Sequence, residues 1–124
     1  QQARNTLFGR AKDNGMGIII KRPIANGAWG TTKSPSEYAD EYFRRAQIIR
    51  DMGPIQGELG DRIAFALGFV FSHPEVDTAI VGTRSPSHMA ANQELMNRLP
   101  IADEVVVELR RRFDEVGANW VQLG

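Results

Sequence analysis

The sequence predicts an α/β fold in which two parallel strands are connected through helices. Residues 17–22 and 77–83 are short segments rich in β-branched residues, and helical patterns lie between them and after them. Residues 18–20 are three consecutive isoleucines, which is typical of a strand buried on both faces, as parallel strands are. Because helices separate the two strands, the chain crosses over between them and the strands run parallel.

The first predicted element is the end of a helix over residues 5–14. Leu7 and Ala11 lie one turn apart, and Gly15 suits the position just past the helix end. The first strand, residues 17–22, follows directly and stops at a proline.

The connection between the strands begins with a loop and a helix. The Gly- and Thr-rich residues 25–33 are predicted to form a long loop. Ser34, with Pro35 at the first helical position and Glu37 three residues on, forms a capping box. This pattern predicts a helix that runs to about Asp51.

A second loop and a second helix complete the connection. Residues 52–60 are interrupted by glycines and a proline, as loops are. Asp61 is the predicted N-cap of a helix over 61–72, whose wide apolar stripe is typical of a helix packed on a core. His73 and Pro74 end this helix just before the second strand.

Two more helices follow the second strand. Ser85 as N-cap and Pro86 at the first helical position predict a helix over 85–97. The last helix is predicted over 103–116, and a tail that carries Trp120 follows it.

Two strands alone cannot form a parallel sheet that is covered on both faces. We therefore expect the chain to be a part of a larger α/β fold, or to complete its sheet with a partner. In an isolated chain, residues 18–20 and 79–81 would present unpaired edges beside apolar side chains. We expect such a chain to associate with copies of itself.

The composition is that of a soluble globular protein, with 42% apolar and 24% charged residues. The 15 basic residues balance the 15 acidic ones, which argues against a polyanion binder, so we expect no nucleic-acid partner. The absence of cysteine excludes disulfides, thiolate metal sites and a cysteine nucleophile, and suits a cytoplasmic protein. The longest apolar run, residues 63–71, is too short to span a membrane, and the polar start shows no signal peptide. The start without methionine suggests a fragment or a processed end.

The end of the second predicted strand is a candidate anion site. There a Gly-Thr-Arg sequence leads at once into a helix, whose first N–H groups and positive dipole end favour anions. Arginine adds a planar charged fork suited to phosphate, and the hydroxyls add donors. The alternative is that Ser85 and Pro86 only cap the helix and Arg84 is a solvated charge. The site would comprise Gly82, Thr83, Arg84, Ser85, His88 and Asn92.

The end of the first predicted strand is a second candidate. Lys21 and Arg22 precede Pro23 where the strand stops, and two cations at this place can clamp an anionic or π-rich ligand. Asn26 and Gly27 in the following loop would wrap a phosphate. The alternative interpretation is a pair of ordinary exposed charges that close a strand.

Other conspicuous residues favour structural roles. His73 is interpreted as a helix-end residue, and two isolated histidines do not make a metal site. Trp29 and Trp120 are interpreted as packing residues. Residues 110–112 are three arginines followed by acidic residues, which indicates a solvated helix face.

Two stretches together resemble the aldo-keto reductase family. The first, ALGFVFSHPEVDTAIVGTRSPSHMAANQEL, has the family's apolar helix, its His-Pro break, its short Ile/Val strand and its Gly-Thr opening of a helix. The second, GMGIIIKRPIANGAW, resembles the family's seventh strand and the turn after it. The two occur in the family's order and cover roughly residues 5–100.

This resemblance implies a (β/α)8 TIM barrel, of which residues 1–124 would be the C-terminal part. The two predicted strands would be strands seven and eight, and the helices over 61–72 and 85–97 would be helices seven and eight. The helix that begins at Ser34 would be an insertion, and the last helix the family's C-terminal one. The family's catalytic Asp, Tyr, Lys and His come from earlier strands, and no residue here matches them. The resemblance thus assigns no catalytic residue and no metal ligand, and we expect the chain alone to be inactive.

The resemblance also implies a site for NADP(H), with NAD as the alternative cofactor. The Gly-Thr-Arg end of the second strand would hold the 2′-phosphate region, and His88 stands where the family often has an arginine. Asn92 matches the residue that bonds the adenine, and the loop from Pro23 to Asn26 matches the one along the pyrophosphate. The implied cofactor residues are Arg22, Pro23, Ile24, Asn26, Gly82, Thr83, Arg84, Ser85, His88 and Asn92.

Two departures from the family pattern bear on this cofactor site. Ala91 replaces an acidic residue that often contacts the adenine, and Arg22 stands near where an aromatic residue often stacks on the nicotinamide. Histidine at position 88 is only partly charged at neutral pH, which weakens the preference for NADP over NAD.

The expected activity of the parent protein is NADPH-dependent reduction of a small aldehyde or ketone. In the family, hydride passes from the nicotinamide C4 to the carbonyl while a tyrosine donates the proton. One alternative is a non-catalytic nucleotide-binding or protein-interaction module on the same barrel. Another is a free-standing α/β interaction module without a cofactor. In each case we expect a cytoplasmic protein with no membrane partner.

Overall fold

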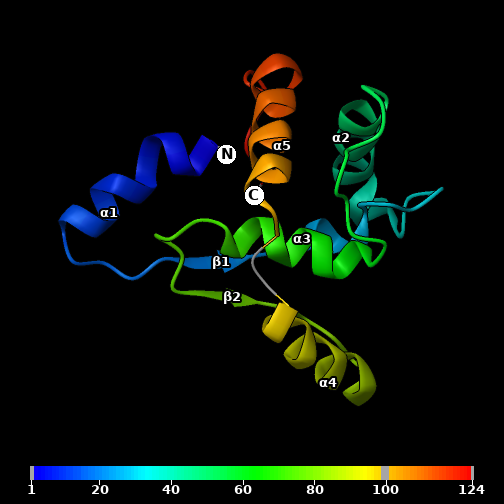
Figure 1. Ribbon diagram of the computed structural model, residues 1–124, viewed down its shortest axis with the longest axis horizontal. Coiled ribbons are helices and arrows are strands. Elements are labelled where there is room, and N and C mark those ends of the chain that lie inside the picture. The colour runs from blue at the N-terminus through cyan, green and yellow to red at the C-terminus, as the bar shows by residue number, and fades with distance from the viewer. Residues whose placement is uncertain (1, 99–100, 124) are drawn as a thin grey trace.

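The computed structural model describes residues 2–98 and 101–123, which form two short strands and five α-helices (Figure 1). The strands are β1 (Ile19–Lys21) and β2 (Thr78–Ile80). The helices are α1 (Gly9–Asp13), α2 (Asp40–Arg50), α3 (Arg62–Phe71), α4 (Pro86–Leu95) and α5 (Asp103–Val116). A π-helical turn, Arg4–Phe8, precedes α1, and 3₁₀ turns lie at Ala25–Gly27, Glu37–Ala39 and Met96–Arg98.

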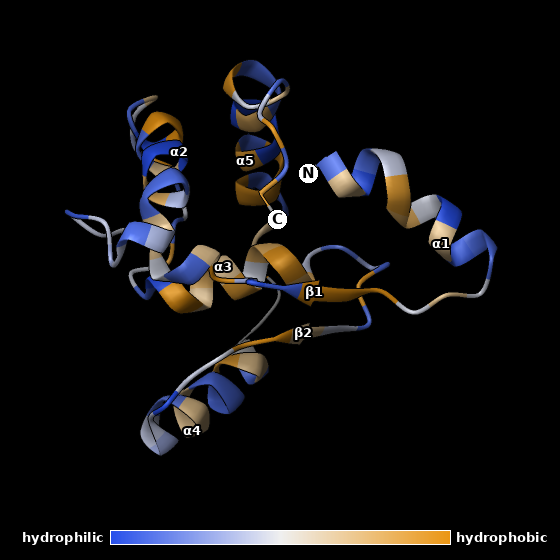
Figure 2. Cartoon of the chain, turned by 180° about the vertical axis from the view of Figure 1, so that it is seen from behind, coloured by the Kyte–Doolittle hydropathy of each residue, from blue (hydrophilic) through white to orange (hydrophobic). Residues whose placement is uncertain are grey.

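The strands β1 and β2 pair in parallel, as the alternation of strands and helices predicts. Ile19 pairs with Thr78, and Lys21 pairs with Ile80. In both views α4 lies on the β2 side of the sheet, whereas α1, α2 and α5 lie on the β1 side (Figures 1 and 2). The paired segments are shorter than the predicted strands over 17–22 and 77–83. β1 ends before Arg22, whose φ of +57° is outside the extended conformation of a strand.

The prediction that the strands are buried on both faces is wrong for the described residues. Ile18 is buried, but Ile19 and Ile80 are each 62% exposed and lie on the same face of the sheet. Within the described chain, no helix covers that face. The opposite face, to which Ile20 and Ala79 point, is half-buried. The sheet therefore presents an apolar face to solvent.

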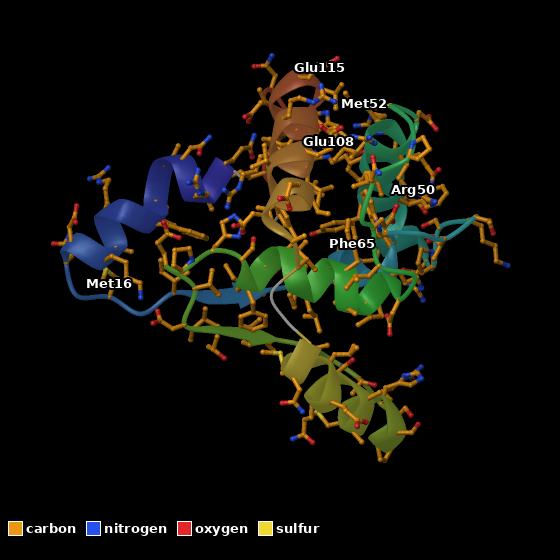
Figure 3. The ribbon with its side chains drawn as sticks, viewed as in Figure 1. Met16, Arg50, Met52, Phe65, Glu108 and Glu115 are labelled. Atoms are coloured by element: carbon orange, nitrogen blue, oxygen red, sulfur yellow. The ribbon has the colours of Figure 1, made fainter. Side chains whose placement is uncertain are left out.

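The hydrophobic core lies between α3, α5 and the loop before α3. Phe65 of α3 and Val105 of α5 are almost completely buried there, and half-buried Trp29 and Ile49 pack against the cluster. Apolar stripes of α3 and α5 are visible in Figure 2, and Phe65 is labelled in Figure 3. The core members are Ile55, Phe65, Ile101, Val105, Val106 and Leu109.

Three of the predicted helix ends have the expected local geometry. At the end of α1, Gly15 has φ +66° and its N–H donates to the carbonyl of Lys12, while the N–H of Met16 donates to that of Ala11. This is a Schellman motif, which requires a left-handed residue at the glycine. The Asp61 carboxylate accepts from the N–H groups of residues 63 and 64, and the Ser85 hydroxyl accepts from that of residue 88.

The predicted capping box at Ser34 is wrong. The Ser34 hydroxyl donates to the carbonyl of Ser36 instead of accepting from a helical N–H, and α2 begins only at Asp40, after a 3₁₀ turn. Ser36 adopts an extended backbone and has no side-chain cap. The predicted end is confirmed, because Asp51 is the C-cap of α2.

Arg112 corrects the prediction that residues 110–112 form a solvated face. Its side chain is only 3% exposed and donates to the carbonyls of Ile49, Gly53 and Pro54 at 3.0, 2.6 and 3.0 Å. Glu108, one turn earlier, accepts from its Nε at 2.7 Å. Arg112 thus ties α5 to the end of α2 and to the loop that follows it.

The packing roles predicted for the histidine and the tryptophans are confirmed. Buried His73 places its Nδ1 2.9 Å from the carbonyl of Phe69 at the end of α3, and burial lowers the pKa of its ring. Trp29 stacks on Phe65 with ring centroids 5.6 Å apart, and Trp120 meets Phe113 edge-on at 5.8 Å.

The first and last described segments lie side by side. Gln2 Nε2 donates to the carbonyls of Trp120 at 2.7 Å and of Ala118 at 3.3 Å. Both ends of the chain accordingly lie near α5 in Figure 1. The guanidinium of Arg45 also holds the tail, since it lies over the Trp120 ring and donates to the carbonyl of Val121.

Asp77 joins α1 to the start of both strands and makes the fold sensitive to acid. Its carboxylate accepts from Lys12 Nζ at 2.7 Å and from the N–H of Ile18 at 2.6 Å, and these bonds, that of Lys12 foremost, lower its pKa from 3.8. A carboxyl whose pKa is lower in the folded state stabilises the fold above its unfolded pKa, and this contribution disappears as the pH falls through the folded pKa.

We expect Asp77→Asn to destabilise the protein at pH 7 and to have little effect well below pH 3.8. Urea unfolding of both proteins between pH 7 and pH 2 measures the difference. Asp13→Asn, at an exposed position that forms no ion pair among the described residues, is the control. A difference between wild type and Asp77→Asn that stays constant over this range would contradict the role of the charge.

Candidate functional site

A cavity of about 820 Å³ lies where β1 and β2 end. Because the strands are parallel, their carboxyl ends meet at the same edge of the sheet, and the loops that follow them form the walls. The start of α3 and one face of α4, from His88 to Leu95, complete the lining. Of the ten predicted cofactor residues, those that line the cavity are Arg22, Pro23, Ile24, Asn26, Gly82, Thr83, His88 and Asn92.

Arg84 and Ser85 do not line this cavity. The Ser85 hydroxyl is used as the cap of α4, and the N–H of Ser85 donates to Thr83 Oγ1 at 3.1 Å. Arg84 is exposed beside the cavity, between Thr83 and the start of α4. The capping alternative therefore describes Ser85 correctly, and the exposure of Arg84 agrees with the alternative of a solvated charge, so its contact with a phosphate stays a prediction.

The loop after β1 has an unusual backbone. Arg22, Ala25 and Asn26 have φ values of +57°, +47° and +55°, a left-handed conformation that is uncommon for residues other than glycine. Such strained positions gather at ligand sites, where the surrounding structure holds them. Asn26 Nδ2 is also buried without a hydrogen-bond partner among the described residues, so this amide has a donor to offer.

Arg62 is a cavity residue that the sequence does not reveal. Its Nη1 donates to the carbonyl of Gly27 at 2.6 Å, and its aliphatic stem lies against Gly30. A Cβ at Gly30 would stand 3.2 Å from that of Arg62, and Gly30 has φ +72°, so a glycine fits this close approach. Arg62 thus fastens the loop over the cavity to the first turn of α3.

Arg22 is held on the side of α2. Its Nη1 donates to the hydroxyl of Tyr42 at 3.0 Å, and its guanidinium lies 5.1 Å from the ring centroid of Tyr38. Arg22 is therefore half-buried and partnered, which corrects the interpretation of an ordinary exposed charge at the strand end.

The part of the chain that the structure describes contains no group of His, Asp and Glu side chains placed to hold a metal ion. Within the same residues, no helix is long and apolar enough to cross a membrane.

The model of the Aldo/keto reductase family matches residues 1–112 of the 124-residue chain. The chain belongs to the aldo/keto reductase family. The resemblance drawn from the two sequence stretches is thereby confirmed, and the matched range includes both strands and the whole cavity wall. Neither a curated protein nor a solved structure matches the chain.

Family membership gives the cavity of this aldo/keto reductase chain its context. The predicted strands seven and eight are the two strands that pair, and the helix predicted to follow each of them in the family borders the cavity. The sequence did not indicate the wall residues at the start of α3 and at the end of α4, which are Asp61, Arg62, Ile63 and Leu95. Ala91, whose position the resemblance assigns to the adenine contact, does line the cavity.

Proposed function

We propose that this aldo/keto reductase chain forms the NADP(H) site of an enzyme that reduces small aldehydes or ketones. The proposal rests on one observation. Residues predicted separately at the ends of the two strands line the same cavity. When bound, the nicotinamide would supply the hydride. The residues that line the cavity would hold and orient the cofactor.

The polar groups of the cavity fit a dinucleotide phosphate. At its α4 end, His88 stands in the first turn, where the helix dipole favours an anion, and Arg84 directly follows the lining residue Thr83. Asn92, one turn on, offers an amide to the adenine. At the β1 end, the unpartnered Asn26 Nδ2 is a donor for a pyrophosphate oxygen.

We further propose that the two strands are strands seven and eight of a (β/α)8 barrel. The exposed face with Ile19 and Ile80 supports this, because alternate side chains of barrel strands fill the barrel interior. In this arrangement residues 1–124 are the C-terminal part of one barrel domain. The proton donor and its neighbours belong to the other strands, so the chain alone binds the cofactor without turning over a substrate.

Replacement of Arg84 tests the assignment of the 2′-phosphate. A charge-assisted hydrogen bond contributes about 1.5–3 kcal/mol, so Arg84→Ala should weaken NADPH binding by about tenfold or more. NADH lacks the 2′-phosphate, and its affinity should stay nearly unchanged. Titration of nucleotide fluorescence with the protein measures both affinities.

Arg10→Ala is the matched control, since Arg10 is exposed on α1 and does not line this cavity. Equal losses of NADPH and NADH affinity in Arg84→Ala would show that Arg84 contacts another part of the cofactor. If wild-type protein binds neither nucleotide, the proposed function is wrong. Tight retention without turnover in the full-length parent would favour the non-catalytic alternative.

The open sheet face also supports a proposal about assembly. Ile19 and Ile80 together offer apolar surface beside unpaired strand edges, which favours pairing with another chain. We expect the 124-residue chain to self-associate, and sedimentation velocity at micromolar concentration measures this. A compact, stable monomer would contradict the expectation.

A further inference from the structure

A second cavity, of about 570 Å³, lies on the other side of the end of β1. Its walls come from the first turns of the chain, from α2, from α5 and from the tail after α5. Lys21 and Arg22 line this cavity and the proposed cofactor cavity alike. The two cavities therefore adjoin at the end of β1.

The charges around the second cavity have one sign. Lys21, Arg22 and Arg45 line it, and no aspartate or glutamate among the described residues does. Lys21 forms no ion pair and no side-chain hydrogen bond within the described chain. An ammonium group without an ion pair, on a lining that also includes two arginines, favours an anion in this cavity.

The carboxylate that pairs with the lining residue Arg45 is shared with a second arginine. Glu41 accepts from Arg44 at 2.7 Å and from Arg45 at 2.6 Å, and these bonds lower its pKa to about 2. Glu41 does not line the cavity, so it balances Arg44 and Arg45 and leaves the charge of Lys21 uncompensated. Arg45 is in turn fixed over the Trp120 ring, 5.1 Å from its centroid.

The rest of the lining combines aromatic residues with aliphatic and neutral polar ones. Trp29, Tyr42, Phe113 and Trp120 contribute rings from four separate segments of the chain. Aromatic walls with a small number of placed polar groups are typical of sites for flat organic ligands. Trp29 and Trp120 are the two tryptophans of the sequence, so the cavity contains its own fluorescent reporters.

We propose that this cavity binds an aromatic carbonyl compound that carries a carboxylate, with the ring between the aromatic walls and the carboxylate at Lys21. The inference rests on the proposed function, since it names the substrate class of the adjoining cofactor site. The cations of the lining would attract the carboxylate. The side chains of Trp29, Phe113 and Trp120 would contact the aromatic ring of the ligand.

The test compares phenylglyoxylate with its methyl ester, which lacks the negative charge and is larger by one methyl group. Binding to the chain is followed by quenching of tryptophan fluorescence, without nucleotide. The acid should bind at least about tenfold more tightly than the ester, as charge-assisted hydrogen bonds require. In Lys21→Gln this preference should largely disappear while the ester binds as before. Lys33→Gln, at an exposed position outside both cavities, should behave as wild type.

Equal affinities of wild-type protein for acid and ester would overturn the proposal, as would absence of binding by both. The comparison of the two probes uses the wild-type protein, so it tests the proposal even if Lys21→Gln does not fold. Nucleotide titration of the same preparation separates this inference from the proposed function. Binding of NADPH without preference for the acid refutes only the substrate class, whereas preference for the acid without NADPH binding refutes the proposed function.

Discussion

Replacement of Arg112 by methionine should lower the free energy of unfolding by about 2–4 kcal/mol, because hydrogen bonds to charged groups contribute about 1.5–3 kcal/mol each and are not additive. Methionine keeps the aliphatic stem but leaves the carbonyls of Ile49, Gly53 and Pro54 without their donor. These carbonyls lie where α2 ends and the loop toward α3 begins. We therefore expect that loop to open first.

Urea unfolding followed by circular dichroism measures this loss, and hydrogen exchange of residues 50–58 locates it. Arg111→Met is the matched control on the same helix, since Arg111 is exposed and its ion pairs within the described residues are with Glu108 and Glu115. The control should leave the unfolding midpoint nearly unchanged. Equal effects of the two substitutions would mean that the hydrogen bonds of the buried Arg112 guanidinium do not add to the free energy of unfolding.

Phe65→Ala should cost about 3–5 kcal/mol, the range for deletion of a buried phenylalanine side chain. Phe65 is 2% exposed, belongs to the core cluster and stacks on Trp29. Trp29 also donates to Glu58 at 2.9 Å, so the pair anchors the loop after β1 to the core. Because that loop forms a wall of the proposed cofactor cavity, NADPH affinity should fall together with stability.

Thermal unfolding with and without NADPH measures both effects. Val107→Ala is the control, because Val107 is 63% exposed on α5 and should change stability by no more than about 0.5 kcal/mol. If Phe65→Ala unfolds more easily but its folded form binds NADPH as wild type does, the loop keeps its position without the stacked ring. The anchoring role of the Trp29–Phe65 pair would then be wrong.

Features of this fold that depend on neighbouring residues could be predicted from the sequence. The caps at Asp61 and Ser85 and the C-terminal glycine of α1 follow from local hydrogen bonding and local conformational preference. The cavity could also be located, because parallel strands place their carboxyl ends at one edge. Its eight predicted wall residues all follow one of the two strands.

Features that depend on distant segments could not be predicted. Arg112 looks like its exposed neighbours in the sequence, and only the carbonyls of the α2–α3 loop distinguish it. Arg62 contacts Gly27 through a loop whose course is set by three left-handed residues, which no local pattern announces. At Ser34 the sequence of a capping box is present, but its hydroxyl bonds within the turn instead.

The contact between Gln2 and the tail orders events during synthesis of the protein. Gln2 donates to carbonyls that lie 116 and 118 residues further along the chain. The turns around Gln2 are translated well before their partners on the tail. Local helices and the pairing of β1 with β2 can therefore form first, whereas docking of the turns around Gln2 waits until residues 118 and 120 have been made. A messenger cut short before the codon for Trp120 would yield a chain whose first turns lack this partner throughout.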